Sequence, residues 1–218
     1  MDASSTGDLP TLENTELYGV VDLNYHLSAE TASVAAERLL EGGVDILRLR
    51  ASAVPRSIVV ELAEEIHAMT SALGVPLILH DGSELLREVP AEGVHLAQEQ
   101  LSIAEVRAAA GRPVVIGRDA HSLPQARAIA EEGANYVGFG PLFANLEKPE
   151  HEPIGLEDLA AVHEQLSIPV FCFGGIRLDN LAQARDAGAR RVVMVSAWLE
   201  AKDIPTAVRS ARSVLLRS

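Results

Sequence analysis

Two short segments near the C-terminal end have the residue pattern of an anion-binding turn. An apolar run over residues 168–173 leads into Gly174 and Gly175, and a second run over residues 192–195 leads into Ser196. Glycine lets the backbone approach a ligand closely, and free N–H groups at the start of a helix attract anions. Strands seven and eight of a (β/α)8 barrel build a phosphate site in this way. The glycine pair also fits a plain strand-to-helix turn, so both interpretations stay open at this point.

Arg48 and Arg50 form a second candidate anion site at the end of a strand predicted over residues 44–50. Side chains alternate along a strand, so both guanidinium groups lie on the same side, opposite Leu47 and Leu49. Two guanidinium groups at one strand end suit a carboxylate or a phosphate. A structural ion pair with a neighbouring Asp or Glu is the alternative, and we favour the ligand.

Of the seven histidines, His121 is the best candidate for acid–base chemistry. It stands just beyond Asp119, where a strand predicted over residues 113–119 ends, and imidazole titrates near neutral pH. The alternative is a solvent-facing ring beside the next helix. Lys148, in the irregular segment 141–154, is a loop cation placed to close over an anion, although most loop lysines are simply solvated. That segment is a candidate lid.

Asp81 and His95 have more ordinary explanations. Asp81 ends a strand predicted over residues 76–81, and without a second carboxylate we expect it to cap the following helix rather than to hold a metal. His95 lies inside the strand predicted over residues 93–97 and is expected to be a hydrogen-bonded core histidine. No tight ligand spacing such as H-E-x-x-H occurs, so the sequence does not predict a transition-metal site.

These side chains need a scaffold, and strand and helix patterns alternate along the chain. Strands are predicted over residues 17–22, 44–50, 76–81, 93–97, 113–119, 136–140, 169–174 and 191–196. Helices are predicted over residues 29–41, 55–73, 83–87, 103–110, 123–132, 156–165, 178–187 and 204–212. This order predicts a single α/β domain, a (β/α)8 TIM barrel over residues 16–218 that follows a loose polar tail, residues 1–15. In such a barrel the active site forms at the C-terminal ends of the strands, where the candidate residues lie.

Composition narrows the ligand class. The 218 residues are 48% hydrophobic, and the formal net charge of −13 disfavours nucleic acid and anionic membranes as partners. The single cysteine excludes an intramolecular disulfide framework, and no apolar run has membrane-spanning length. Since the first fifteen residues also lack signal-peptide blocks, we expect a cytoplasmic protein with a small anionic ligand. Barrels of this type often pair, so a homodimer is compatible with the sequence.

Several modest motifs recur in order over nearly the whole chain, and together they resemble the thiamine-phosphate synthase/TenI superfamily. They lie at residues 18–22, 47–50, 79–81, 93–98, 116–118, 134–143, 148, 168–176 and 195–197. The resemblance implies a (β/α)8 barrel that binds the phosphate of a thiazole phosphate at its last two strand ends, through Gly174, Gly175, Val195 and Ser196. The synthase of this superfamily joins a pyrimidine diphosphate to a thiazole phosphate and uses Mg²⁺.

This chain departs from the synthase pattern on the diphosphate side. The synthase motif Gln-x-Arg-x-Lys is represented by Arg48, Arg50 and Ser52, and its Asn-Asp by His80-Asp81. Gln100 occupies the position of the second Mg²⁺ carboxylate of the synthase, and Asp119 occupies the position of a serine that contacts the diphosphate. Residues 145–148 replace the synthase motif Thr-x-Thr-Lys. A carboxylate about 4 Å from a phosphate charge costs roughly 4 kcal/mol at an effective dielectric constant near 20. We therefore expect weakened synthase activity.

The TenI-type branch matches better after the fifth strand. Its pattern Ile-Gly-Arg-x-x-His-Ser is present as Ile116, Gly117, Arg118, His121 and Ser122. This branch includes thiazole tautomerases, which aromatise a carboxythiazole phosphate by moving a proton, with this histidine as the proposed shuttle. The resemblance thus implies an isomerase without cofactor or metal, with Arg48 or Arg50 on the carboxylate. The alternatives are a divergent synthase that places Asp81 on Mg²⁺, and a non-catalytic phosphate-ligand binding or regulatory protein.

Overall fold

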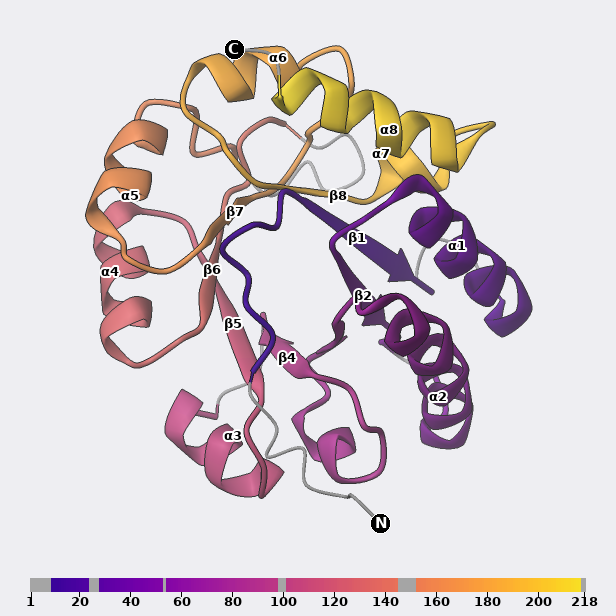
Figure 1. Ribbon diagram of the computed structural model, residues 1–218. Coiled ribbons are helices and arrows are strands. Elements are labelled where there is room, and N and C mark those ends of the chain that lie inside the picture. Colours follow the sequence, from indigo (N-terminus) through magenta and orange to yellow (C-terminus); the bar gives the residue numbers. More distant parts are fainter. Residues whose placement is uncertain (1–8, 24–27, 53, 98–100, 145–151, 217–218) are drawn as a thin grey trace.

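The computed structural model describes residues 9–23, 28–52, 54–97, 101–144 and 152–216, which form a closed barrel surrounded by helices (Figure 1). Eight parallel strands pair in sequence order, and β1 closes the ring by pairing with β8. The predicted (β/α)8 barrel is therefore confirmed. The strands are β1 (Leu17–Asp22), β2 (Ile46–Arg50), β3 (Leu77–His80), β4 (Gly93–Leu96), β5 (Val115–Ala120), β6 (Tyr136–Phe139), β7 (Val170–Cys172) and β8 (Val192–Met194).

The helices cover the outside of this ring, mostly near the predicted positions. They are α1 (Ala29–Gly42), α2 (Arg56–Leu73), the 3-10 helix η1 (Ser83–Arg87), α3 (Ile103–Ala110), α4 (Leu123–Glu131), α5 (Leu159–Gln165), α6 (Leu181–Asp186), α7 (Ser196–Leu199) and α8 (Ile204–Leu215). The helix α7 is not predicted by the sequence pattern. The strand expected to run through Ser196 ends at Met194, because Ser196 already begins α7.

Local sequence signals explain where several helices begin and end. The Ser28 side chain accepts a hydrogen bond from the Thr31 amide at the start of α1, and Ser102 with Glu105 forms a capping box at the start of α3. The helix α1 ends at Gly43, which has a φ of 90°. Only glycine adopts that left-handed conformation without strain, so this position stops the helix as predicted.

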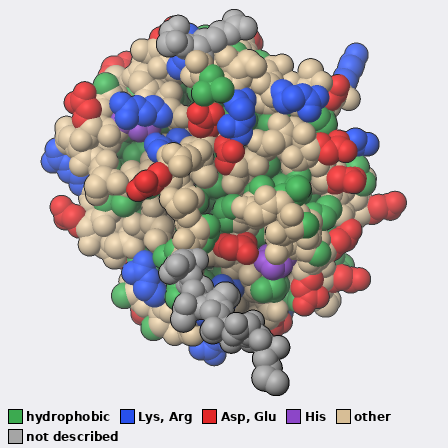
Figure 2. All heavy atoms as spheres, in the orientation of Figure 1, with side chains coloured by type: hydrophobic (Ala, Val, Ile, Leu, Met, Phe, Trp, Pro, Cys, Tyr) green, Lys and Arg blue, Asp and Glu red, His purple; other side chains and the backbone are tan. Residues whose placement is uncertain are grey.

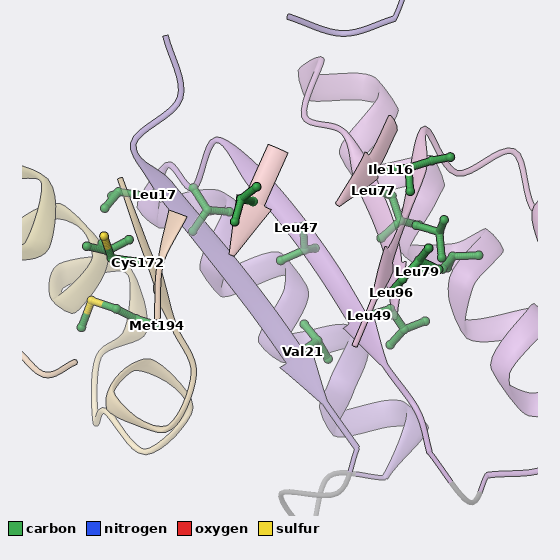
Figure 3. Close-up of a cluster of buried hydrophobic side chains, with 14 of the residues drawn as sticks. Leu17, Val21, Leu47, Leu49, Leu77, Leu79, Leu96, Ile116, Cys172 and Met194 are labelled. Atoms are coloured by element: carbon green, nitrogen blue, oxygen red, sulfur yellow. The ribbon is translucent and has the colours of Figure 1, made fainter. Parts of the chain in front are cut away.

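Alternation along the strands divides the core into two parts. Outward side chains pack under the helices, and Figure 3 shows several of them, including Leu17, Leu47, Leu77 and Ile116. Inward side chains fill the barrel interior with Tyr18, Val20, Ile46, Ile78, Val115, Tyr136, Phe171 and Val193. Leu12, which is 5% exposed, packs with this interior cluster, so the chain just before β1 also covers apolar surface of the barrel.

Polar contacts tie the last helix to the first strands. Arg212 of α8 lies 2.9 Å from Glu16 and 2.8 Å from Asp45, and the second Asp45 oxygen accepts the Leu17 amide. The helix α8 also packs against α1 (Figure 1). These contacts fasten the two ends of the ring, where the barrel closes.

The face drawn in Figure 2 carries acidic and basic side chains interspersed, without a continuous basic patch. None of the helices in the described segments has the length and apolar character needed to cross a bilayer.

Candidate active site

A cavity of about 280 Å³ opens at the C-terminal ends of the strands. The structure brings together most of the predicted site residues there: Arg48, Arg50, Asp119, His121, Gly174, Gly175, Val195 and Ser196 all line it. They come from β2, from β5 and its turn, and from the turns after β7 and β8, as the location rule for this fold predicts. Lys148 lies outside the described residues, as does the centre of the candidate lid.

Strand register sets a row of side chains across the floor of this cavity. His80, His95, Gly117 and Tyr136 are neighbours on β3, β4, β5 and β6. A Cβ atom at Gly117 would lie 2.0 Å from Tyr136 Cζ, so the glycine leaves the space that the tyrosine ring fills. With that space open, Tyr136 reaches past β5 to His95, and His80 stacks on the other side of His95 with ring centroids 5.8 Å apart.

Tyr18, Tyr136 and His95 form a buried hydrogen-bonded chain that ends against the Asp119 carboxylate at the cavity. Tyr18 Oη lies 2.9 Å from Tyr136 Oη, Tyr136 Oη lies 3.0 Å from His95 Nδ1, and His95 Nε2 lies 3.1 Å from Asp119 Oδ1. Tyr18, Tyr136 and His95 are at most 1% exposed. The prediction that His95 is a hydrogen-bonded core histidine is therefore confirmed.

Burial determines the protonation states of these side chains, and the protonation states set the direction in which the hydrogen bonds are donated. It lowers the pKa of His95 and raises that of Tyr18 to about 12, so at neutral pH the imidazole is uncharged and the phenol is protonated. The ionised carboxylate favours a hydrogen on the ring nitrogen that faces it, so Nε2 of His95 is protonated beside Asp119 and Nδ1 accepts from Tyr136. Tyr136 in turn accepts from Tyr18. Every hydroxyl and N–H of the chain thus points toward Asp119.

Asp119 is ionised at the end of the chain. Burial opposes its ionisation, but the His95 ring and the Arg48 guanidinium outweigh burial and lower the pKa of Asp119 to about 2. Its side chain is 23% exposed and faces the cavity. The site therefore presents one fixed negative charge beside its arginines.

The two arginines lie on the same side of β2, as the strand period predicts, but their surroundings differ. Arg50 Nη1 lies 3.3 Å from Oδ2 of Asp22, a buried carboxylate on β1, so the structural ion pair is present for this residue. Arg48 has no carboxylate within 4 Å among the described residues, and its guanidinium lies 5.4 Å from the Tyr18 ring centroid. The Nε atoms of both are buried without a described partner. Arg48 is thus the less neutralised cation for a ligand.

His121 is held at the mouth by backbone contacts. Its Nδ1 atom lies 2.5 Å from the Gly140 carbonyl oxygen, and its amide donates to Gln125 Oε1 at 2.8 Å. A carbonyl oxygen only accepts, so Nδ1 carries the hydrogen. In the neutral ring this leaves the lone pair on Nε2, which is the form required of a base.

The glycine pair after β7 has a structural reason as well as a chemical one. Gly174 has a φ of 90°, and a Cβ atom there would lie 2.2 Å from Pro141 Cβ. The segment after β6 packs directly on this turn, with the Phe143 amide donating to the Gly174 carbonyl at 3.1 Å. No described residue accepts a hydrogen bond from the amides of Gly174, Gly175, Val195 or Ser196. These four amides are a set of open donors for an anion.

Asp81 does not cap the following helix, contrary to expectation. The helix η1 follows Gly82 and has no side-chain cap, whereas Asp81 Oδ1 accepts the Ala97 amide at 2.7 Å and so links β3 to the end of β4. Its neighbour His80 is buried, and this burial together with Arg48 lowers the pKa of His80 to about 2. At neutral pH His80 is uncharged.

The described residues do not fit a Mg²⁺ site. They contain no group of three or more His, Cys, Asp or Glu side chains placed to share a metal ion. The Asp81 carboxylate is engaged by a backbone amide, and the cavity wall beside it carries His80, whose ring is an imidazole rather than the oxygen donor that Mg²⁺ prefers. Residues 98–100 and 145–151 lie outside this description.

Sequence reasoning missed the roles of Tyr18, Tyr136, Gly117, Gly138 and Asp22. The two tyrosines lie at positions of the predicted strands whose side chains point into the barrel, so the alternation along the strands predicts their burial. Their contact with His95 was not, because it depends on the register between β4, β5 and β6. Gly138 lies opposite Asp119 in that register, where a glycine has no local turn to explain it.

The fold and the cavity define a (β/α)8-barrel protein with a polar site at its strand ends. Residues 17–198 match the family model described as thiamine monophosphate synthase. Because this match covers most of the chain, the chain belongs to that family.

Relatives and solved structures agree with this assignment. The chain is 34% identical over 210 residues to a thiamine-phosphate synthase of Pelotomaculum thermopropionicum, covering 96% of each chain. It is 37% identical over 201 residues to one of Thermus thermophilus, covering 91% of this chain and 96% of the relative. A thiamine phosphate pyrophosphorylase structure from Pyrococcus furiosus superposes with a TM-score of 0.82 at 26% identity, covering 92% of this chain and 95% of that one. A 3-hexulose-6-phosphate synthase from Salmonella typhimurium, with a TM-score of 0.67 at 22% identity, shares the fold.

Proposed function

We propose that this chain is a thiamine-phosphate synthase, a transferase that joins a pyrimidine diphosphate to a thiazole phosphate. The observation that carries the proposal is its identity of 34% and 37% to proteins named for that activity, over 96% and 91% of its length. This revises the expectation from the motif after the fifth strand, which favoured a tautomerase and kept the synthase as an alternative.

The two sides of the cavity carry two sets of hydrogen-bond donors, and each set suits one anionic substrate. The open amides of Gly174, Gly175, Val195 and Ser196 suit a single phosphate, which requires several donors in a small space. Arg48 and Arg50, from β2, offer charged donors for a diphosphate. A thiazole phosphate on the amides and a diphosphate on the arginines would bring both substrates into one cavity.

Asp119 restricts where the diphosphate can lie. Its negative charge repels a phosphate by roughly 4 kcal/mol at about 4 Å and an effective dielectric constant near 20, and each arginine attracts one by a similar amount at that distance. The diphosphate is therefore expected on the side of Arg48 and Arg50, away from the Asp119 carboxylate.

The reaction places its greatest electrostatic demand on those arginines. Joining the two substrates releases inorganic diphosphate, and negative charge grows on the oxygen that leaves the pyrimidine. Arg48 and Arg50 supply hydrogen-bond donors to that charge. The amides after β7 and β8 hold the second substrate so that the encounter takes place within one site.

A second candidate, the proton-shift isomerase, is favoured by the geometry of His121. The Gly140 carbonyl holds the hydrogen on Nδ1, which leaves Nε2 as the basic atom of a residue that lines the cavity. That reaction needs a phosphate site, a carboxylate partner such as Arg48, and one base, and it needs no diphosphate site.

One pair of assays separates the candidates. The purified protein is given the pyrimidine diphosphate and the thiazole phosphate with and without Mg²⁺, and the joined product is measured. It is separately given the dihydrothiazole carboxylate phosphate, and aromatisation is measured. Joined product from wild type, with a strong loss in Arg48→Ala, supports the synthase. Aromatisation that His121→Asn abolishes, without joined product under either Mg²⁺ condition, overturns it in favour of the isomerase. Thiazole phosphate binding in calorimetry without either reaction indicates the non-catalytic alternative.

A further inference from the structure

The hydrogen-bonded chain beneath Asp119 has no part in the reaction described above. Tyr18, Tyr136 and His95 are buried, and only Asp119 of the four lines the cavity. Buried polar networks of this kind cost free energy to desolvate unless every member is satisfied. Here both tyrosine hydroxyls are hydrogen-bonded, and His95 Nε2 lies 3.1 Å from a carboxylate that faces the ligand space.

The geometry leaves one carboxylate oxygen for the ligand. Oδ1 of Asp119 contacts His95 Nε2 at 3.1 Å, whereas no described side chain contacts Oδ2 as a hydrogen-bond donor. A Cβ atom at Gly138 would lie 2.1 Å from Oδ1, so the glycine is required for this position of the carboxylate. The carboxylate is thus seated by β4 from one side and by β6 from the other.

The Asp119 carboxylate suits a different chemical group of the ligand than the other polar groups of the cavity do. The amides after β7 and β8 and the two arginines all donate hydrogen bonds, and they suit anionic oxygens. Asp119 accepts hydrogen bonds and repels anions. Of the groups near it, Arg48 is a cation and the His80 and His95 rings are uncharged at neutral pH. This wall therefore suits the nitrogen heterocycle of a substrate rather than its phosphoryl group.

We propose that Asp119 selects a ligand ring that presents an N–H donor, and that Tyr18, Tyr136 and His95 are positioning residues that hold its carboxylate on the cavity wall. The proposal rests on the synthase assignment for the presence of a phosphorylated nitrogen heterocycle in this cavity. An exocyclic amino group, or a protonated ring nitrogen beside it, donates to Oδ2 in a charge-assisted hydrogen bond. A ring without such a donor leaves the desolvated carboxylate without that bond, which disfavours its binding.

Two small probes test the selection directly. (4-Aminopyrimidin-5-yl)methyl phosphate and pyrimidin-5-ylmethyl phosphate differ only in the amino group, so phosphate binding is common to both. Calorimetry on the wild type is expected to show at least tenfold tighter binding of the amino probe, and Asp119→Ala is expected to bring the ratio of the two dissociation constants close to one. A wild-type ratio near one, or a ratio that Asp119→Ala leaves unchanged, overturns the proposal.

The positioning residues are tested by the same ratio, which damage to the fold alone does not move. Tyr136→Phe keeps the ring and removes the hydroxyl that donates to His95, so the ratio is expected to fall several-fold. Phe171→Leu is the control, because Phe171 packs edge-on against Tyr18 and Tyr136 without joining the hydrogen-bonded chain. That variant is expected to lose stability and keep the ratio. A Tyr136→Phe protein with the wild-type ratio refutes the positioning role.

Product formation by the wild type separates this inference from the proposed function. A protein that forms the joined product yet binds both probes equally refutes the selection by Asp119 and leaves the synthase assignment intact. A protein that prefers the amino probe, loses that preference in Asp119→Ala and forms no joined product supports the selection and refutes the assignment.

Discussion

Gly138 and Asp119 face each other across β6 and β5, and the missing side chain of the glycine is what admits the carboxylate. The two residues are direct register partners, and a Cβ atom on Gly138 would lie 2.1 Å from Asp119 Oδ1. One layer nearer the barrel floor the arrangement is reversed, with Gly117 of β5 opposite Tyr136 of β6. Because glycine lies on β6 in one layer and on β5 in the next, Asp119 and Tyr136 both have the space to contact His95 of β4.

The hydrogen-bonded chain predicts an order of stability losses for two hydroxyl deletions. Tyr136→Phe removes the group that donates to His95 and accepts from Tyr18, so it leaves two buried groups unsatisfied and is expected to cost about 2–3 kcal/mol of unfolding free energy. Tyr18→Phe removes only the first donor and is expected to cost about 1 kcal/mol. Urea denaturation of both variants measures the difference. An equal or larger loss in Tyr18→Phe would contradict the central place of Tyr136 between Tyr18 and His95.

Asp119 predicts a loss of stability in acid. Its pKa falls from 3.8 to about 2 in the folded protein, so the unfolded chain takes up the proton first as pH decreases. The contribution, on the order of 2 kcal/mol, is complete above about pH 5 and is lost as pH falls from 4 toward 2. The measurement is the unfolding free energy of wild type and Asp119→Asn between pH 6 and 3. The gap between the two proteins should narrow over this range, and a gap that widens with acid would show that the pKa is raised instead.

The turn after β7 predicts different costs for two glycine substitutions. Gly174 and Gly111 both have positive φ, 90° and 68°, but a Cβ atom at Gly111 meets nothing within 4 Å, whereas one at Gly174 meets Pro141 at 2.2 Å. Gly111→Ala is expected to cost about 1–2 kcal/mol from backbone strain alone. Gly174→Ala should cost a further 1–3 kcal/mol or so from overpacking, and it should also weaken thiazole phosphate binding. Thermal denaturation and calorimetry check both effects, and equal stability losses would count against the close packing.

Substitution of Arg48 is expected to affect mainly anion affinity, whereas substitution of Arg50 is expected to affect mainly stability. Arg48 has no ion-pair partner among the described residues, so Arg48→Ala is expected to weaken binding of inorganic diphosphate by about 10-fold or more with little loss of stability. Arg50 partners the buried Asp22, so Arg50→Ala is expected to cost more stability and less affinity. Calorimetry with inorganic diphosphate and urea denaturation give the two numbers for each variant. The reverse ranking would mean that Arg50 is the principal anion contact.

Local patterns in the sequence determined the scaffold. Apolar strands alternating with glycine-stopped helices predicted the barrel, because period and turn chemistry act over a few residues. The same reasoning placed Arg48 and Arg50 on one side of β2 and His121 at a strand end, and all three line the cavity. The interior position of His95 also follows from its place in a strand.

Tertiary structure decided the partners of these residues. The Asp22–Arg50 pair, the Asp81–Ala97 contact and the chain from Tyr18 to Asp119 join different strands, and each depends on the register between those strands. A shift of one residue turns every side chain of a strand to the other face, and nothing local in the sequence specifies that shift. Barrel closure then brings β1 beside β8, so residues far apart in the chain share one cavity. The sequence by itself therefore determined which side chains face the interior, and only the folded barrel decided which of them meet.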